Sequence, residues 1–244
     1  SVVSLFTPPD PASTSPSSRR SYRIEDADLS YKYVDEQGTV LYRIARFVPK
    51  TFRPFVPSPD GQWWVMGLPK TTRRVLYQLP AVLSVRDEGG TIYLVEGEKD
   101  ADNVNRVLLA GTVNAVATTW TGGVPGWRDH ESAYLDTLRG AAKVVIVRDR
   151  DGEDPENPQN SYKGQRLASH IHGVLKPIVG DVQVVEALAG KDASDHLDAG
   201  YDLTDFRGLS DDEIVAFDVA EVAAPVAYSP LTLADCEARL RGLP

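Results

Sequence analysis

Between residues 88 and 200, short apolar runs alternate with segments of helical periodicity. The apolar runs are rich in β-branched residues and cover residues 92–95, 113–118, 143–147 and 182–188. Apolar positions recur at helical spacing over residues 99–109, 131–138 and 163–174. Strands that alternate with helices form parallel βα units, whose strands are buried on both faces. The pattern therefore predicts an α/β domain over residues 88–200, with a parallel sheet flanked by helices.

A different pattern precedes this domain. Runs of strand type lie at residues 31–34, 40–47 and 62–66, and turn residues such as Gly38 and Gly61 separate them. Prolines at four positions exclude a long helix here: Pro49, Pro54, Pro57 and Pro59. We therefore expect a small, mostly antiparallel lobe over residues 21–87.

The two ends of the chain differ from both regions. Residues 1–20 are rich in Pro and Ser and hold few apolar side chains, which predicts a disordered linker or tail. Residues 201–244 form an acidic C-terminal extension, to which the sequence assigns no role.

Composition narrows the class of protein. Of 244 residues, 42% are hydrophobic and 25% charged, as in soluble globular proteins. No apolar run approaches the roughly 18 residues of a membrane span. The lone Cys236 excludes an internal disulfide and a Cys-based zinc ribbon within this chain. We expect a cytoplasmic protein without membrane association.

Charge is distributed unevenly along the chain. The net charge of −9 argues against a general coat for nucleic acid. Residues 41–80 nevertheless carry a net charge of +6, and residues 181–222 carry −10. The basic segment can meet phosphates, whereas the acidic one can hold cations or repel anions.

Carboxylates follow three of the predicted parallel strands. They are Glu96 after the first run, Asp149 and Asp151 after the third, and Asp192 and Asp195 after the fourth. Ligands bind at the carboxyl ends of the strands in an open α/β sheet, so we expect these acids to border one crevice.

Crowded carboxylates repel one another unless a cation neutralises them. Ligation by oxygen alone suits Mg²⁺ or Mn²⁺ rather than zinc. Residues i and i+2 of an extended strand end point the same way, so Asp149 and Asp151 are expected to face one metal ion. Glu96 is then placed to act as a general base toward a hydroxyl or a water.

Three motifs in this region resemble the TOPRIM domain, the metal-binding module of bacterial DnaG-type primases, topoisomerases and some nucleases. VEGEKDA at residues 95–101 is similar to its first motif, and VIVRDRDG at 145–152 to its Asp-x-Asp motif. GKDASDHL at 190–197 resembles the closing motif of phage and plasmid primases. The segments at 31–52 and 73–80 also resemble the lobe that precedes TOPRIM in phage primases. A polar insertion at residues 153–161 departs from the family pattern.

The resemblance implies a TOPRIM fold and a role for each acid. Glu96 would be the catalytic acid or base and a metal ligand, beside the ligands Asp149 and Asp151. Asp100, Asp192 and Asp195 would surround the metal, Mg²⁺ or Mn²⁺.

Basic residues are the candidates for binding nucleotides and nucleic acid, because Lys and Arg neutralise backbone phosphates without reading sequence. Those of the N-terminal lobe are Arg43, Arg46, Lys50, Arg53, Arg73 and Arg74. Those beside the acidic motifs are Lys99, Lys163 and Lys191.

The resemblance implies a primase-type nucleotidyltransferase core that makes RNA primers from NTPs on single-stranded DNA, in a bacterial or phage-infected cell. A zinc-ribbon domain and a replicative helicase would then lie on other domains or chains. Two alternatives stay open. One is a TOPRIM nuclease that uses the same metal site with water as nucleophile. The other is a non-catalytic module that binds DNA through residues 41–80 and needs no metal.

Overall fold

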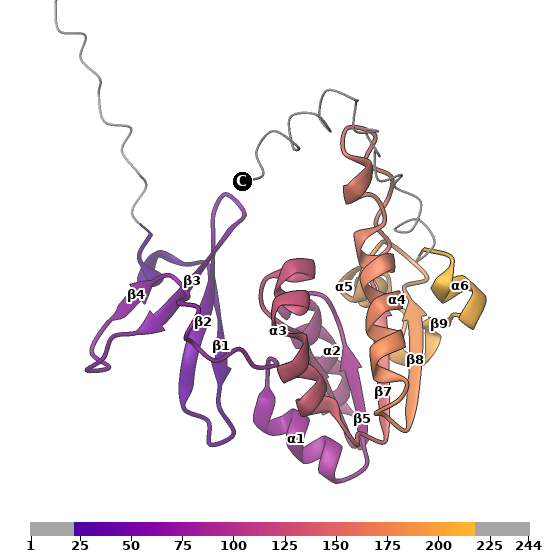
Figure 1. Cartoon of the computed structure of the whole chain (residues 1–244), viewed down its shortest axis with the longest axis horizontal. Coiled ribbons are helices and arrows are strands. Elements are labelled where there is room, and N and C mark those ends of the chain that lie inside the picture. The colour runs from indigo at the N-terminus through magenta and orange to yellow at the C-terminus, as the bar shows by residue number, and fades with distance from the viewer. Residues whose placement is uncertain (1–21, 218–244) are drawn as a thin grey trace, which may run out of the picture.

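The computed structural model describes residues 22–217, which form two sheets with helices around the second (Figure 1). The predicted linker at residues 1–20 and the part of the C-terminal extension beyond residue 217 lie outside the described residues.

The N-terminal sheet is a four-stranded antiparallel meander, as the sequence predicts. Its strands are β1 (Leu29–Val34), β2 (Val40–Phe47), β3 (Thr51–Pro57) and β4 (Trp64–Met66), in that order. β3 was not among the predicted runs, because its two prolines are unfavourable in strands. A 3₁₀ helix, Ile24–Asp26, precedes β1.

The second sheet confirms the predicted parallel α/β domain. Its parallel strands are β5 (Thr91–Leu94), β6 (Ala115–Thr118), β7 (Lys143–Arg148) and β8 (Asp181–Glu186). The short strand β9 (Arg207–Gly208) pairs antiparallel with β8, which gives the order β6-β5-β7-β8-β9. All four parallel strands fall where β-branched runs predict them.

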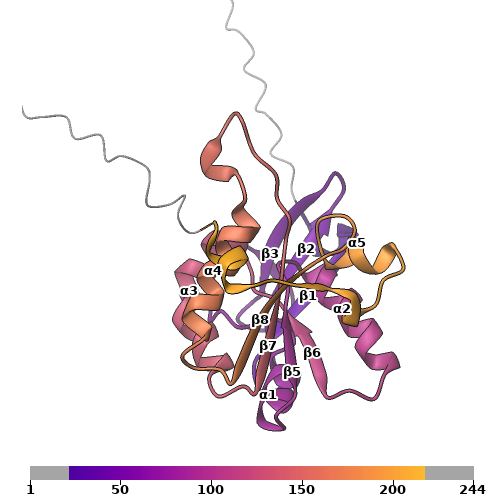
Figure 2. The same ribbon diagram turned by 90° about the vertical axis from the view of Figure 1, so that its right-hand side faces the viewer.

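Helices cover both faces of this sheet (Figure 2). They are α1 (Leu79–Asp87), α2 (Glu98–Ala110), α3 (Gly123–Leu138), α4 (Lys163–Leu175), α5 (Ala193–Asp198) and α6 (Asp211–Val215). One face packs against α1, α3 and α4, and the other against α2 and α5. Two 3₁₀ turns, Pro158–Asn160 and Leu203–Asp205, lie in the connections. None of the helices within residues 22–217 has the length and apolar character of a membrane span.

Two elements differ from the sequence-based expectation. α3 begins at Gly123 rather than near residue 131, and it bends at His130, where φ is −131°. Gly122 and Gly123 indicated a turn, yet Pro125 fits the first turn of a helix because its missing N–H has no partner there. α1 lies within the range expected for the N-terminal lobe, but it packs against β5 and β6.

Tyrosines join the N-terminal lobe to the α/β domain. Tyr31, Tyr33 and Tyr42 share one buried cluster with residues of α2 and the second sheet. The Tyr33 hydroxyl donates to Glu98 Oε1 at 2.8 Å. The hydroxyls of Tyr42 and Thr121 lie 3.0 Å apart. These contacts hold the face of β2 and β3 beside the carboxyl ends of the parallel strands.

Candidate active site

The carboxyl ends of β5 and β7 and the loop after β8 border a cleft of about 520 Å³. Its acidic residues are Glu96, Glu98, Asp100, Asp149 and Asp192. Most of the predicted acids therefore meet at one place, although they lie up to 96 positions apart in the sequence. Parallel strands produce this convergence, because their carboxyl ends share one edge of the sheet.

Glu96 lies two residues beyond the end of β5 and is half-buried. Burial raises its pKa, and the negative charges of Asp151 and Asp100 raise it further. The ammonium groups of Lys191 and Lys163 act in the opposite direction. A carboxylate with a raised pKa accepts a proton more readily, as a general base requires.

Asp149 follows β7 at the floor of the cleft. Burial and the charges of Glu96, Asp100 and Asp192 raise its pKa to about 8. Gly164 at the start of α4 packs closely against it, since a Cβ there would lie 2.8 Å from Asp149 Cβ. Any larger residue at position 164 would displace this carboxylate.

Asp151 is oriented differently from its partner in the Asp-x-Asp motif. Its Oδ2 accepts a hydrogen bond from Gly164 N at 2.9 Å, and Gln165 Nε2 donates to its carbonyl at 2.8 Å. The side chain thus satisfies a free N–H at the start of α4. Only Asp149 of the pair lines the cleft, and the ligand role of Asp151 stays a prediction.

Both acids of the third motif accept hydrogen bonds from nearby backbone N–H groups. Asp192 caps α5, with its Oδ1 accepting from Asp195 N at 2.8 Å. Asp195 turns back to the loop and accepts from Lys191 N at 2.9 Å, so it does not line the cleft. Asp100 accepts from Ser194 N at 3.1 Å, which ties α2 to α5. Burial is the main cause that raises the pKa of Asp100.

The acidic side chains of the cleft suit a hard cation, because each of them offers oxygen as the ligand atom. Within residues 22–217, no group of three or more His, Cys, Asp or Glu side chains is arranged to hold a metal ion. Mg²⁺ does not need such a cage, since proteins commonly bind it through one or two carboxylates plus water and substrate phosphates. Glu96 and Asp149, with their raised pKa values, fit that mode of binding.

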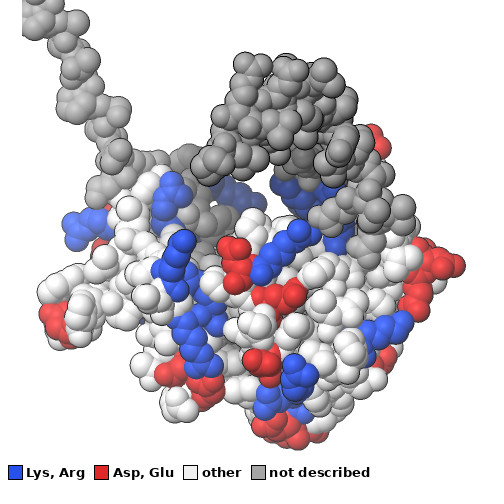
Figure 3. Space-filling view, in the orientation of Figure 1, with Lys and Arg blue, Asp and Glu red and all other residues white. Residues whose placement is uncertain are grey.

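Basic residues from both the N-terminal lobe and the α/β domain also line the cleft. Arg46 and Lys50 line it from the N-terminal lobe, and Lys99 and Lys191 line it from the α/β domain. Phe52, the cross-strand partner of Arg46, also lines the cleft and is 41% exposed. Figure 3 shows Lys and Arg side chains along the N-terminal lobe beside acidic side chains at the centre of the molecule.

The other predicted basic residues lie away from the cleft. Side chains alternate across β2, so Arg43 stands on the face opposite Arg46, with its guanidinium 4.5 Å from the Trp64 ring centre. Arg53 of β3 stacks on Tyr22.

Two more of these arginines are engaged locally, and one lysine stands at the edge of the site. Arg73 pairs with Glu36, and Arg74 donates to the carbonyl of Leu68. Lys163, at the start of α4, acts to lower the pKa of Glu96, but it does not line the cleft.

Sequence reasoning missed two side chains that line the cleft, whereas the loop at Gly122 and Gly123 could be anticipated from its glycine pair. Tyr31 and Glu98 line the cleft, as does the loop from Trp120 to Gly123. Glu98 lies two residues after Glu96 inside the first motif, which was an available signal. Nothing in the sequence indicated Tyr31, because its position depends on how the lobe docks on α2.

Comparisons with known proteins find no similar sequence, but they find similar folds. No family model matches the sequence, and no curated protein matches it. The primase domain of bacteriophage T7, in a complex with the T7 lagging-strand DNA polymerase, an RNA/DNA hybrid and dTTP, aligns with a TM-score of 0.50. The identity is 16%, and the alignment covers 70% of each chain. The chain has the fold of a primase catalytic core.

Further primase structures align over much of this chain. The primase fragment of the T7 primase-helicase has a TM-score of 0.49 and 16% identity, with 78% of this chain covered. The Escherichia coli primase catalytic core has a TM-score of 0.46 and 15% identity, with 88% covered. The chain spans 61% of the length of each of these two. The alignment with the T7 primase domain confirms the predicted fold class.

Proposed function

We propose that the cleft is the active site of a primase-type nucleotidyltransferase, which makes RNA primers on single-stranded DNA in a bacterial or phage-infected cell. One observation carries the proposal. A wall of partly buried carboxylates, including Glu96 and Asp149, faces a wall with Arg46 and Lys50 across one cleft. Such a cleft can hold nucleic acid on one side and a cation with a triphosphate on the other.

The acidic residues would do the chemistry. Asp149 and Glu96 would hold Mg²⁺ or Mn²⁺, which neutralises phosphate charge when bound. Glu96 would accept the proton of the attacking 3′-hydroxyl, whose oxygen forms a bond to the α-phosphorus of the incoming NTP as pyrophosphate leaves.

The basic residues would bind and orient the substrates. Lys99 and Lys191 border the acidic wall and would contact the triphosphate, while Arg46 and Lys50 would hold the phosphates of the template. Phe52, the partly exposed cross-strand partner of Arg46, offers a ring on which a base can stack. A zinc-ribbon domain and a helicase on other domains or chains would supply template choice and unwinding.

Primer synthesis from labelled NTPs on single-stranded DNA tests the proposal. The wild type should extend in the presence of Mg²⁺ or Mn²⁺, and Glu96→Gln should lower the rate at least ~100-fold. Asp136→Asn, an exposed acid of α3, is the matched control and should be active. Fragments of the DNA in place of extension products would instead identify the nuclease.

A non-catalytic DNA-binding module is the second candidate. It is favoured by the lack of a three-ligand acidic group within the described residues. Calorimetric titration with Mn²⁺ separates the two: metal-dependent heat that Asp149→Asn removes supports the enzyme, and no heat in either protein supports the module.

A further inference from the structure

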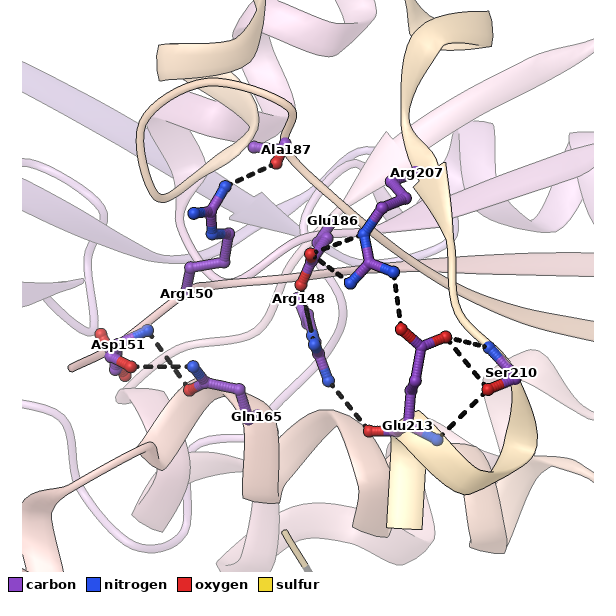
Figure 4. A network of polar contacts seen from close by, with 9 residues as sticks. All are labelled: Arg148, Arg150, Asp151, Gln165, Glu186, Ala187, Arg207, Ser210 and Glu213. Carbon is purple, nitrogen blue, oxygen red and sulfur yellow. Dashed lines mark hydrogen bonds and ion pairs between the residues drawn. The ribbon is translucent and has the colours of Figure 1, made fainter. Parts of the chain in front are cut away.

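Glu186, the last residue of β8, is a buried carboxylate that binds two arginines (Figure 4). It is 8% exposed. Its Oε2 accepts from Arg148 Nε at 3.0 Å and Nη2 at 2.7 Å. Its Oε1 accepts from Arg207 Nε at 2.9 Å and Nη2 at 2.5 Å. Both oxygens of Glu186 are therefore engaged by guanidinium groups.

The contacts continue into the C-terminal extension. Glu213 of α6 accepts from Arg207 Nη1 at 2.6 Å, and its carbonyl accepts from Arg148 Nη1 at 3.4 Å. Two arginines and two glutamates leave this network without net charge. Burial alone would raise the pKa of Glu186, but the hydrogen bonds from Arg148 and Arg207 outweigh burial and lower it.

The network is adjacent to the acidic wall in the sequence. Arg148 is 7% exposed and directly precedes Asp149, yet its guanidinium turns to Glu186. Arg150 directly follows Asp149, and its Nη1 donates to the carbonyl of Ala187 at 2.9 Å. Within residues 22–217, Asp149 forms no ion pair, although an arginine stands on each side of it in the sequence.

Arg148 and Glu186 are register partners on β7 and β8, which brings their side chains together, but such an ionic network contributes little to fold stability. A buried ionic triad is often no more stable than well-packed apolar residues of similar volume. An arginine is also the best side chain to neutralise a carboxylate, because its planar fork matches both oxygens. A released Arg148, adjacent to Asp149 in the sequence, would be free to turn toward its carboxylate and compete with a cation for it.

We propose that Glu186 is a positioning residue that holds Arg148 away from Asp149 and so keeps this carboxylate free for a divalent cation. The inference rests on the metal site of the proposed function. It also gives the C-terminal extension a role, since Arg207 and Glu213 complete the set of partners that hold Glu186 and Arg148.

Calorimetric titration of the whole chain with Mn²⁺ tests the inference without recourse to activity. Glu186→Gln should weaken Mn²⁺ binding by about tenfold or more. Arg148→Met should bind Mn²⁺ like the wild type, because the arginine that would compete for Asp149 is absent. The double variant should recover the binding that Glu186→Gln loses. Asp211→Asn removes an exposed ion pair between α6 and Lys176, the residue after α4, and as the matched control it should leave binding unchanged.

The variants separate competition from simple anchoring of β7. Weakened binding in Arg148→Met, or no recovery in the double variant, would show that Arg148 is needed as an anchor and would overturn the inference. Unchanged binding in Glu186→Gln would also overturn it, and would leave the proposed function intact. Lack of Mn²⁺ binding by the wild type would overturn both. If Glu186→Gln does not fold by circular dichroism, Arg148→Met decides: retained binding supports the inference and weakened binding rejects it.

Discussion

The acidic and basic walls of the cleft are built in opposite ways. The acidic wall collects partly buried side chains from distant parts of the chain, and their mutual repulsion helps to raise the pKa of Asp149 to about 8. Arg46 and Lys50 come from nearby positions in the sequence, on β2 and in the turn between β2 and β3 of the N-terminal lobe. The carboxylates of the acidic wall therefore repel one another, and a bound cation would relieve this electrostatic strain. The basic wall, in contrast, only attracts anions.

The largest expected effect comes from removing a charge from the acidic wall. Asp149→Asn should lower primer synthesis at least ~100-fold, because the cation loses a ligand. The same change should stabilise the metal-free protein, since it removes a buried, crowded carboxylate. Primer extension and denaturant unfolding without metal measure the two effects. A variant that is both inactive and less stable would contradict the strained wall.

Removing charge from the basic wall should weaken attraction without changing the fold. The pair Arg46→Ala and Lys50→Ala should bind single-stranded DNA about tenfold more weakly and lower the salt dependence by roughly 0.7 per lost phosphate contact. Fluorescence anisotropy at several salt concentrations measures both.

Arg43→Ala with Arg53→Ala is the matched control for the basic wall, because it removes the same charge from the face of β2 and β3 that lies away from the cleft. Equal losses in the two pairs would show that DNA does not distinguish the faces and that the basic wall is not the binding surface.

The strain in the acidic wall should also appear as a dependence of stability on pH. The pKa of Asp149 in the folded protein, about 8, lies above the usual value, so folding favours its protonated form. This contribution is complete below about pH 4 and is lost as the pH rises to about 8.

Urea unfolding of the metal-free protein between pH 5 and 8 measures this loss. The wild type should lose more stability than Asp149→Asn over that range, by more than about 1 kcal/mol. Parallel pH profiles would show that Asp149 does not carry the strain.

The smallest expected effect concerns the contact that holds the two walls together. Tyr33→Phe removes the hydrogen bond to Glu98 and should destabilise the protein by roughly 1–2 kcal/mol. Thermal unfolding measures the change, and Tyr201→Phe, at an exposed position, should have little effect. No loss in Tyr33→Phe would mean that packing alone docks the lobe.

Much of the acidic wall could be predicted because it follows from topology. Once the runs at 92–95 and 143–147 are read as parallel strands, Glu96 and Asp149 must meet at one edge. The orientation of Asp151 and Asp195 could not be predicted, since it depends on backbone N–H groups of α4 and of the loop at Lys191. Their spacing alone does not contain that information.

Arg46 and Lys50 line the cleft, whereas the other predicted arginines lie away from it, and their role in binding stays a prediction. Tyr42 and Ile44 alternate with Arg43, so strand periodicity already indicated that Arg43 and Arg46 face opposite ways. That signal was available but was outweighed by the charge of the whole segment. The partners of Glu186 were beyond sequence reasoning, because a strand of two residues, β9, brings Arg207 to it.

The tyrosine contacts between the N-terminal lobe and the α/β domain bear on whether the cleft can open. Tyr31, Tyr33 and Tyr42 are buried in one cluster with α2 and the second sheet, so moving the walls apart would expose their rings to water. Uncovering three such rings costs several kcal/mol, about 25 cal/mol per Å² of apolar surface. The tyrosine cluster therefore opposes separation of the two walls, so a ligand should enter and leave the cleft along its length rather than by a parting of the lobe from the α/β domain.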